Sequence, residues 1–275
     1  MSDRQTDRQT DRQTDRQTNT QTEKYHPEPY WSEVAVRISQ REDNNVIAGD
    51  DEPYYRYKRK AFLSMLNSVD FNNKSVLEIG CGPGGNLSDI LKVFKPSSVN
   101  GVDISNNMIA LAAKNLSGKG VKLIKIDGLT LPFENNSIDM VFSATVLQHN
   151  TDEKMLFQII SEMARVAKEK VVIFERIEDT ITGDDLCLGR PISYYQKAFE
   201  SNGLKLGAIS FINIRVSYIV CGAIRKLLNP KSRKEGEPLN GFSIFLQKIS
   251  LPLTKVLDKV FTSRKDIAKL EFLKN

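Results

Sequence analysis

The sequence is poor in cysteine and lacks any long apolar run, and each absence excludes a class of protein. Its three cysteines, Cys81, Cys187 and Cys221, are too scattered for a disulfide framework or a cysteine-based metal site. We expect reduced thiols in a cytoplasmic protein and no bound metal. The most apolar stretch, residues 216–224, is too short to span a bilayer, and no apolar signal region begins the chain. An integral membrane protein is therefore not expected.

The first residues lack apolar side chains altogether. Residues 3–18 are four perfect copies of Asp-Arg-Gln-Thr, and no apolar residue occurs between Ser2 and Lys24. Nothing there offsets chain entropy, so we predict that residues 1–24 are disordered and that residues 25–275 form one domain. The codons GAC, AGA, CAG and ACA would encode this repeat as copies of the tetranucleotide GACA, whose slippage shifts the reading frame. This pattern predicts phase variation, with an arbitrary spacer as the alternative.

The stretch 74–94, KSVLEIGCGPGGNLSDILKVF, changes its pattern twice. A short apolar run ends at Ile79, four glycines and a proline occupy residues 80–85, and apolar residues then recur at helical spacing. This pattern predicts a strand, a tight turn and a helix. The glycines let the backbone turn sharply and approach a ligand, and we expect Asn86 to cap the helix, whose N-terminus faces the bound group.

The same glycines fit two families. Gly80, Gly82 and Gly85 match the dinucleotide fingerprint G-x-G-x-x-G, which is a weak signal alone. Glu78, two residues before the first glycine, gives E-x-G-C-G-P-G, and in this form the stretch resembles motif I of the class I S-adenosylmethionine-dependent methyltransferases. The resemblance implies that Glu78 and the glycines hold the methionine moiety of the cofactor. A dinucleotide enzyme would need no such carboxylate.

Strand and helix patterns alternate after this motif, which predicts an α/β fold. We expect a Rossmann-like, doubly wound, mostly parallel seven-stranded sheet with N-terminal helices and a helical insertion before the last strand. The predicted helices are 28–41, 53–69, 106–116, 152–167 and 192–201, the predicted strands are 98–104, 121–126, 138–143, 170–174, 206–212 and 267–272, and the insertion covers about 214–263.

Two aspartates follow predicted strands. Asp103 lies 23 residues after Gly80, near the spacing at which an acidic residue meets ribose hydroxyls. The resemblance makes Asp103 the ribose ligand, places Asp127 beside the adenine amino group and packs Met108 on the adenine face. Taken singly, each aspartate fits a loop or a helix cap equally well. Their order at the ends of successive predicted strands favours a nucleoside site.

Residues 127–150, DGLTLPFENNSIDMVFSATVLQHN, carry the most specific match. They look like the Leu-Pro-Phe, Phe/Ile-Asp and Leu-His/Gln-His blocks of the small-molecule methyltransferase subgroup known as type 11. The resemblance covers about residues 70–176 and argues against a nicotinamide oxidoreductase. The cofactor site that follows from it, with Tyr57 added, consists of Glu78, Gly80, Cys81, Gly82, Gly84, Asp103, Ile104, Met108, Asp127, Gly128, Ala144 and Tyr57.

Tyr57 and His149 are assigned from their chemistry. A tyrosine face suits a sulfonium cation, so Tyr57 is expected to cover the cofactor, with helix packing as the alternative. His149 follows the fourth predicted strand, and its ordinary pKa of about 6.5 suits a general base for a hydroxyl acceptor. Packing at a helix start is the alternative for His149. Methyl transfer otherwise needs little beyond placing the acceptor in line with the methyl group.

The end of the chain is basic. From Arg225 to Asn275 there are 12 Lys or Arg and 5 Asp or Glu, which gives this stretch a charge of +7. Helical apolar spacing at 216–228 and 242–261, with Pro252 expected to start a new helix, predicts a cap over the substrate pocket. Apolar surface beside cationic charge suits an acceptor with a phosphate and a lipid, and peripheral contact with a membrane. A solvated lysine-rich surface is the alternative.

These patterns predict methyl transfer from S-adenosylmethionine to a small-molecule or glycan acceptor in the cytoplasm, with the inner face of the membrane as a further possible location. O-methylation of a cell-surface sugar or its lipid-linked precursor is the specific hypothesis, and a quinone or other isoprenoid is the alternative acceptor. A non-catalytic S-adenosylmethionine-binding module is the alternative of another class. The sequence has no Asn/Asp-Pro-Pro-Tyr/Phe motif and no recognisable RNA-binding domain, so no nucleic-acid partner is expected, although the basic C-terminus keeps a nucleic-acid methyltransferase as a further alternative.

Overall fold

The computed structural model describes residues 27–41, 52–234 and 237–274. The tetrapeptide repeat lies outside these ranges. The expected disorder of residues 1–24 and the expression switch therefore stay predictions.

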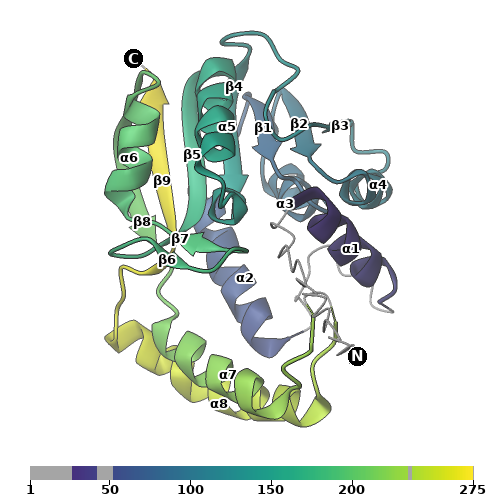
Figure 1. Ribbon diagram of the computed structural model, residues 1–275, viewed down its shortest axis with the longest axis vertical. Helices are drawn as coiled ribbons and strands as arrows, with labels where there is room; N and C mark the ends of the chain where they lie inside the picture. The colour runs from purple at the N-terminus through teal and green to yellow at the C-terminus, as the bar shows by residue number, and fades with distance from the viewer. Residues whose placement is uncertain (1–26, 42–51, 235–236, 275) are drawn as a thin grey trace, which may run out of the picture.

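Seven strands form one sheet in the order β3-β2-β1-β4-β5-β9-β8 (Figure 1). Strand β9 is antiparallel to both of its neighbours, β5 and β8, and the other six strands share one direction. The predicted mostly parallel seven-stranded sheet is therefore confirmed. Its strands are β1 Ser75–Ile79, β2 Ser98–Asp103, β3 Val121–Lys125, β4 Ile138–Ala144, β5 Ala167–Ile177, β8 Leu204–Phe211 and β9 Asp266–Lys274. A short hairpin, β6 Thr182–Gly183 and β7 Leu188–Gly189, was not predicted.

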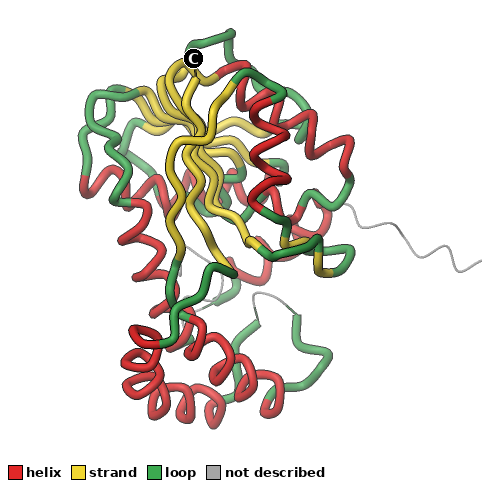
Figure 2. Tube along the Cα trace, turned by 90° about the vertical axis from the view of Figure 1, so that its left-hand side faces the viewer, coloured by secondary structure: helices red, strands yellow, loops and turns green. Residues whose placement is uncertain are grey.

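Helices cover both faces of the sheet, and this explains why its central strands read as continuous apolar runs. In β5, residues 171–174 are all fully buried. One face packs on α5 and α6, and the other packs on α2, α3 and part of α4 (Figures 1 and 2). The helices are α1 Pro27–Ser39, α2 Pro53–Leu66, α3 Gly85–Val93, α4 Asn106–Asn115, α5 Glu153–Val166 and α6 Ile192–Glu200.

The order of the strands reverses beside β1, at the boundary between β1 and β4. Strand β1 pairs with β2 on one side and with β4 on the other, so Ile79 lies beside Val102 and Ser143. In open α/β sheets, ligands bind at such a switch point, at the carboxyl ends of the strands. The register therefore brings the loops after β1, β2 and β4 to one place.

Two helices, α7 Arg215–Leu228 and α8 Gly241–Val260, fill the insertion between β8 and β9, and we call this pair the cap. The two helices lie side by side beyond the carboxyl edge of the sheet (Figures 1 and 2). The expected new helix at Pro252 is wrong, because α8 runs through Pro252 as one helix. Gln247 before Pro252 and Asp258 after it both accept hydrogen bonds from α2, and this tertiary anchoring offsets the hydrogen bond that proline removes.

Polar side chains on the buried side of α8 fix the cap to the domain. Asp258 is 1% exposed, and its Oδ1 accepts hydrogen bonds from the backbone N–H groups of Val216 at 2.7 Å and Ser217 at 3.1 Å. The same carboxylate accepts hydrogen bonds from the hydroxyl groups of Ser217 and Tyr57. Gln247 Oε1 accepts from the N–H of Tyr54 at 3.3 Å. Helix α8 thus supplies the missing acceptors at the N-termini of both α7 and α2.

Removal of the Asp258 carboxylate is expected to loosen the cap. We expect Asp258→Ala to lower the free energy of unfolding by about 2–4 kcal/mol, because a helix cap is lost and buried donors are left unpaired. Urea denaturation followed by circular dichroism measures this difference. Lys259→Ala, at the adjacent exposed position, is the control. Equal stability of the two variants would contradict the capping role.

Candidate active site

A cavity of about 540 Å³ lies at the carboxyl edge of β1, β2 and β4. The glycine loop and the residues after β2 form one part of its wall, and Tyr55, Tyr218 and Arg225 form the part nearest the cap. The predicted residues that line it are Gly80, Cys81, Gly82, Asp103, Ile104, Met108, Gly128, Ala144 and His149. The topology therefore brings nine of the predicted site residues to one cavity.

The loop after β1 needs glycine because its backbone adopts positive φ angles. Gly80 has φ +65°, and a Cβ there would lie 2.4 Å from Val146 Cγ2. Gly82 has φ +50°, and a Cβ added there would have no atom of the described residues within 4 Å. Because Gly82 lines the cavity, the space that its missing side chain leaves is open to a ligand.

Asn86 does not cap α3, contrary to the prediction. The N-cap is Gly84, and Asn86 lies inside the helix. Its Nδ2 donates a 2.6 Å hydrogen bond to Glu78 Oε1, and its Oδ1 accepts from Arg59 Nη1 at 2.5 Å. The Asn86 side-chain amide therefore binds the buried Glu78 carboxylate and does not cap the N-terminus of α3. Asn86 still lines the cavity, whereas Gly84 does not and serves to begin the helix.

Glu78 is a buried carboxylate with spare acceptor capacity. Its side chain is 1% exposed, and among the described residues its Oε2 has no hydrogen-bond partner. Burial raises the pKa of Glu78 to about 8, although the Asn86 amide and the Arg59 charge lower it. Unpartnered buried oxygens are rare in proteins, and one beside a glycine loop is suited to a ligand that carries a cationic donor.

Asp103 ends β2 and is 6% exposed. Its Oδ2 accepts from the N–H of Gly82 at 2.9 Å, and its Oδ1 accepts from the N–H of Ser105 at 2.8 Å. Burial raises the pKa of this carboxyl group, and these two hydrogen bonds oppose the shift. Each carboxylate oxygen can accept a further hydrogen bond, so Asp103 joins the two loops and still presents acceptors to the cavity.

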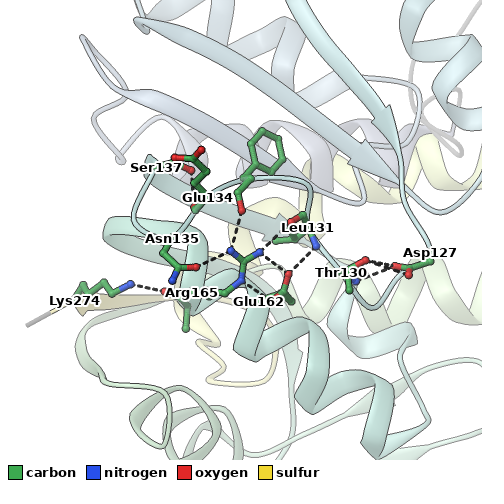
Figure 3. Close-up of polar contacts among 11 residues, drawn as sticks. Asp127, Thr130, Leu131, Glu134, Asn135, Ser137, Glu162, Arg165 and Lys274 are labelled. Atoms are coloured by element: carbon green, nitrogen blue, oxygen red, sulfur yellow. Dashed lines mark hydrogen bonds and ion pairs between the residues drawn. The ribbon is translucent and has the colours of Figure 1, made fainter.

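Asp127 and Tyr57 are not among the residues that line the cavity. The Asp127 carboxylate is exposed and accepts from the N–H groups of Leu129 and Thr130, both at 2.8 Å, and these bonds lower its pKa. Figure 3 shows its contact with Thr130. It stabilises its own turn and does not line the cavity. Tyr57 faces α8, where its hydroxyl donates to Asp258 and its ring lies under Lys255. Its neighbour Tyr55 lines the cavity instead.

The Leu-Pro-Phe block is held by a salt bridge on α5 (Figure 3). Arg165 pairs with Glu162 at 2.6 Å and also donates to the carbonyl oxygens of Leu131 and Phe133. Glu162 Oε2 accepts from the N–H of Leu131 at 2.8 Å. This clamp fixes the loop after β3, which carries Gly128 to the cavity.

His149 lies in a short 3-10 helix, Leu147–His149, after β4. Its Nδ1 is 2.7 Å from the carbonyl oxygen of Leu186, which can only accept, so Nδ1 carries the proton in the neutral ring. Its Nε2 then accepts from Gln148 Nε2 at 3.2 Å. The ring also packs edge-on against Trp31, with 5.0 Å between centroids. The tautomer held in this way leaves Nε2 as the basic nitrogen.

Two buried charges that the sequence analysis missed support this loop. Glu175, in β5, is fully buried and accepts from the N–H groups of Val146, Leu147 and Gln148, at 3.0–3.1 Å. Burial raises the pKa of Glu175 to about 7 in spite of these donors. Arg190, also fully buried, donates to the carbonyl oxygens of Leu147 and Asn150. Glu175 had a signal in the sequence, because it is a carboxylate directly after the apolar run 171–174 of β5. Arg190 had no such signal.

Gly82→Ala is expected to separate ligand binding from folding. The new methyl group meets no described protein atom, so the free energy of unfolding should fall by only about 1–2 kcal/mol, the cost of a left-handed alanine. The methyl group narrows the ligand space, so affinity for the cofactor should fall at least about tenfold through steric exclusion. Calorimetry and thermal melting measure the two effects. Gly80→Ala, which collides with Val146, is the comparison and should lose more stability.

Among the described residues, no group of three or more His, Cys, Asp or Glu side chains could hold a metal ion. No helix in the described ranges has both the length and the apolar content needed to cross a membrane. The three cysteines are free, and Cys81 and Cys221 are buried.

Comparison with known proteins agrees with this geometry. Residues 76–170 match the family model described as a methyltransferase domain. The fatty-acid O-methyltransferase of Mycolicibacterium smegmatis is 27% identical over 117 residues, which cover 41% of this chain and 40% of the relative. The phthiotriol/phenolphthiotriol dimycocerosates methyltransferase of Mycobacterium tuberculosis is 35% identical over 97 residues, or 35% of this chain and 36% of that protein. The matches thus span less than half the length of these two relatives.

A solved structure extends the likeness to nearly the whole fold. Magnesium protoporphyrin IX methyltransferase from Synechocystis, with S-adenosylmethionine bound, superposes with a TM-score of 0.55 at 15% identity and covers 89% of this chain and 97% of its own. At this identity the likeness concerns the fold, while the matched family model concerns residues 76–170. Residues 76–170 therefore match a methyltransferase domain, and the sheet that carries them has the fold of the S-adenosylmethionine-bound structure.

Proposed function

We propose that this chain O-methylates a sugar in a lipid-linked precursor of a cell-surface glycan, with S-adenosylmethionine as the methyl donor. The observation that carries the proposal is the shared cavity, whose wall includes the glycine loop at one part and Tyr218 and Arg225 of the cap at another. A donor held on the glycine loop and an acceptor held under the cap would lie in one space.

The residues at the glycine loop fit the donor. The unpartnered Oε2 of Glu78 suits its ammonium group, the space at Gly82 admits its methionine moiety, and Asp103 offers acceptors to its ribose hydroxyls. Met108, Ile104 and Gly128 supply an apolar wall for its adenine. When bound, the donor supplies a methyl group on a positively charged sulfur, which is already activated for transfer. The protein residues orient the donor and exclude water.

The acceptor is inferred from the cap side of the cavity. Arg225 lies over the ring of Tyr55 and donates to its hydroxyl group at 2.5 Å, so a fixed cation faces the space beside two tyrosines. Arginine suits the phosphate of a lipid-linked sugar. The names of the two relatives, a fatty-acid methyltransferase and a dimycocerosates methyltransferase, support an acceptor with an apolar chain. The expression switch predicted from the repeat of residues 3–18 favours an acceptor at the cell surface, because switchable genes suit exposed products.

His149 is the proposed proton acceptor for the sugar hydroxyl group. We expect His149→Gln to lower kcat about tenfold with KM nearly unchanged, less than a general base typically contributes because the methyl group is already activated. The pH dependence of kcat should lose the limb that follows the imidazole. The initial rate of S-adenosylhomocysteine formation between about pH 6 and pH 9, a range that brackets an ordinary imidazole pKa, measures both effects. A tenfold rise in KM with unchanged kcat would assign His149 to binding instead.

The proposed acceptor is tested in cells that lack the gene. We expect the surface glycan of the deletion strain to lose about 14 Da per methyl group by mass spectrometry, since that mass separates a methoxyl from a hydroxyl group, and the intact gene to restore it. Methyl-labelled S-adenosylmethionine with fractionated wild-type lipids would show whether the label enters a lipid-linked sugar. An unchanged glycan with an undermethylated quinone would replace the sugar with the isoprenoid acceptor. Absence of any turnover, with the cofactor still bound, would favour a non-catalytic binding module.

A further inference from the structure

Helix α8 has its polar side buried and its apolar side exposed. Its buried residues are Ser243, Gln247, Leu251, Thr254 and Asp258, of which four are polar. The large apolar side chains of its opposite face are exposed, at Phe242 58%, Phe245 53%, Ile249 59%, Leu253 65%, Val256 58% and Val260 69%. We call these six residues the outer stripe. A surface helix normally has the reverse arrangement, so the outer stripe is not explained by the core of this chain.

The outer stripe follows one side of the helix. Its members are spaced by 3, 4, 4, 3 and 4 residues, which keeps them on a single face. The buried face contacts α2 through Tyr57 and α7 through Ser217. The outer stripe therefore points away from the domain. Helix α8 itself lies at the end of the molecule beyond the sheet (Figures 1 and 2).

The charges beside the outer stripe are positive. Lys248, Lys255 and Lys259 are exposed on α8, and the single acidic residue of the helix, Asp258, is buried. Helix α7 adds the exposed Arg215 and Lys226 and has no acidic residue. The two cap helices thus present apolar and cationic groups to solvent without exposed acidic ones.

We infer that the outer stripe of α8 is a docking surface for an anionic lipid bilayer. This inference deepens the membrane contact of the proposed function, on which it rests, by naming the surface that makes it. An interfacial helix inserts its apolar face at the boundary between head groups and acyl chains, while lysines beside that face attract anionic lipids. A second copy of the chain fits less well, because two such faces would bring their lysines together.

Docking of α8 on a bilayer would place a lipid-linked acceptor next to the cavity. Tyr218 and Arg225 on α7 line the cavity, and α7 packs directly against α8. A lipid-linked acceptor would then move from the bilayer to the cavity past the cap, without its apolar tail entering bulk water. The outer stripe thus offers a physical reason for placing a helical insertion at this edge of the sheet.

Vesicle sedimentation of the purified full chain tests the docking surface. We expect binding to phosphatidylcholine vesicles that contain phosphatidylglycerol, and much weaker binding to phosphatidylcholine alone. Ile249→Ser with Leu253→Ser should lower the partition coefficient at least about tenfold, because two apolar insertions are lost. Lys248→Glu with Lys259→Glu should lower it about 25-fold or more, at about 1 kcal/mol per lysine and with added repulsion.

The matched control replaces exposed apolar residues outside the cap. Val93→Ser with Phe157→Ser, at positions that are 54% and 45% exposed, should leave vesicle binding unchanged. Calorimetry with S-adenosylmethionine should give wild-type affinity for every variant, so a docking defect is separated from a failure of the cofactor site. Equal vesicle binding by wild type and the Ile249/Leu253 variant would overturn the inference. A wild-type dimer in solution that only this variant dissociates would also overturn it, in favour of self-association.

Discussion

Asp103→Ala is expected to bind S-adenosylmethionine about 10- to 100-fold less tightly than the wild type, because charge-assisted hydrogen bonds contribute about 1.5–3 kcal/mol. Two effects contribute to this loss. The ribose hydroxyls lose their acceptor, and the N–H groups of Gly82 and Ser105 lose the carboxylate that joins their loops. Isothermal titration calorimetry measures the affinity directly. Asp179→Ala, at a side chain that is 80% exposed, is the control and should bind normally.

A ligand analogue separates these two effects. A form of S-adenosylhomocysteine that lacks the ribose 2′-hydroxyl and 3′-hydroxyl groups has nothing for Asp103 to accept from. If Asp103 binds the ribose, wild type and Asp103→Ala should differ much less for this analogue than for S-adenosylhomocysteine itself. An equal loss for both ligands would assign Asp103 to loop structure alone. Unchanged affinity of the variant for the natural cofactor would remove the assignment altogether.

Glu78→Gln is expected to stabilise the free protein and to weaken cofactor binding. Burial raises the pKa of Glu78 from 4.5 to about 8, so the folded state holds this proton more tightly than the unfolded chain. The contribution of Glu78 to stability therefore falls as the pH rises from about 4.5 to about 8, and is level outside that window. Glutamine does not ionise, so the variant should be more stable than wild type at about pH 8, by roughly 4 kcal/mol for a pKa shift of this size, and much closer to wild type at about pH 5.

The binding effect of the same change has the opposite sign. A cationic ammonium group gains from the ionised carboxylate, so wild-type affinity should rise from about pH 5 to about pH 8 while the affinity of Glu78→Gln stays flat. At the upper end of this range the variant should bind at least about tenfold more weakly, from the loss of one charge-assisted hydrogen bond. Thermal melting and calorimetry across this range measure both effects. Glu169→Gln, at a carboxylate on the surface, is the control. If Glu78→Gln were less stable than wild type at about pH 8, neighbouring groups would already stabilise the ionised Glu78 carboxylate.

The fold was predictable because its signals are local. Alternating apolar strands, amphipathic helices and a glycine turn each depend on a few neighbouring residues, and the seven-stranded sheet follows from their order. Gly80, Gly82 and Asp103 reach one cavity because parallel strands end at one edge. The insertion was predictable as helical because its apolar residues recur at helical spacing, although that spacing did not reveal that the apolar side would face outward.

Where the structure departs from the local pattern, a tertiary contact of the side chain or helix decides the outcome. Asn86 has the side chain of a helix cap, but the buried Glu78 carboxylate and Arg59 engage its amide. Tyr57 was assigned from aromatic chemistry, but Asp258, 201 residues away in sequence, accepts its hydroxyl hydrogen bond. Pro252 is a start signal for a helix only when neighbouring contacts do not hold the chain helical on both sides. Local pattern cannot report such partners.

The place of β9 between β5 and β8 has a consequence for biosynthesis. Residues 266–274 pair with both neighbours, so on the ribosome β8 has no partner strand until this segment has emerged. The cap helices are made before it and must wait beside two open sheet edges, which are prone to pairing with other chains. Completion of the sheet therefore falls after synthesis of the cap, and a nascent chain arrested before residue 266 would be a substrate for chaperones instead of a folded domain.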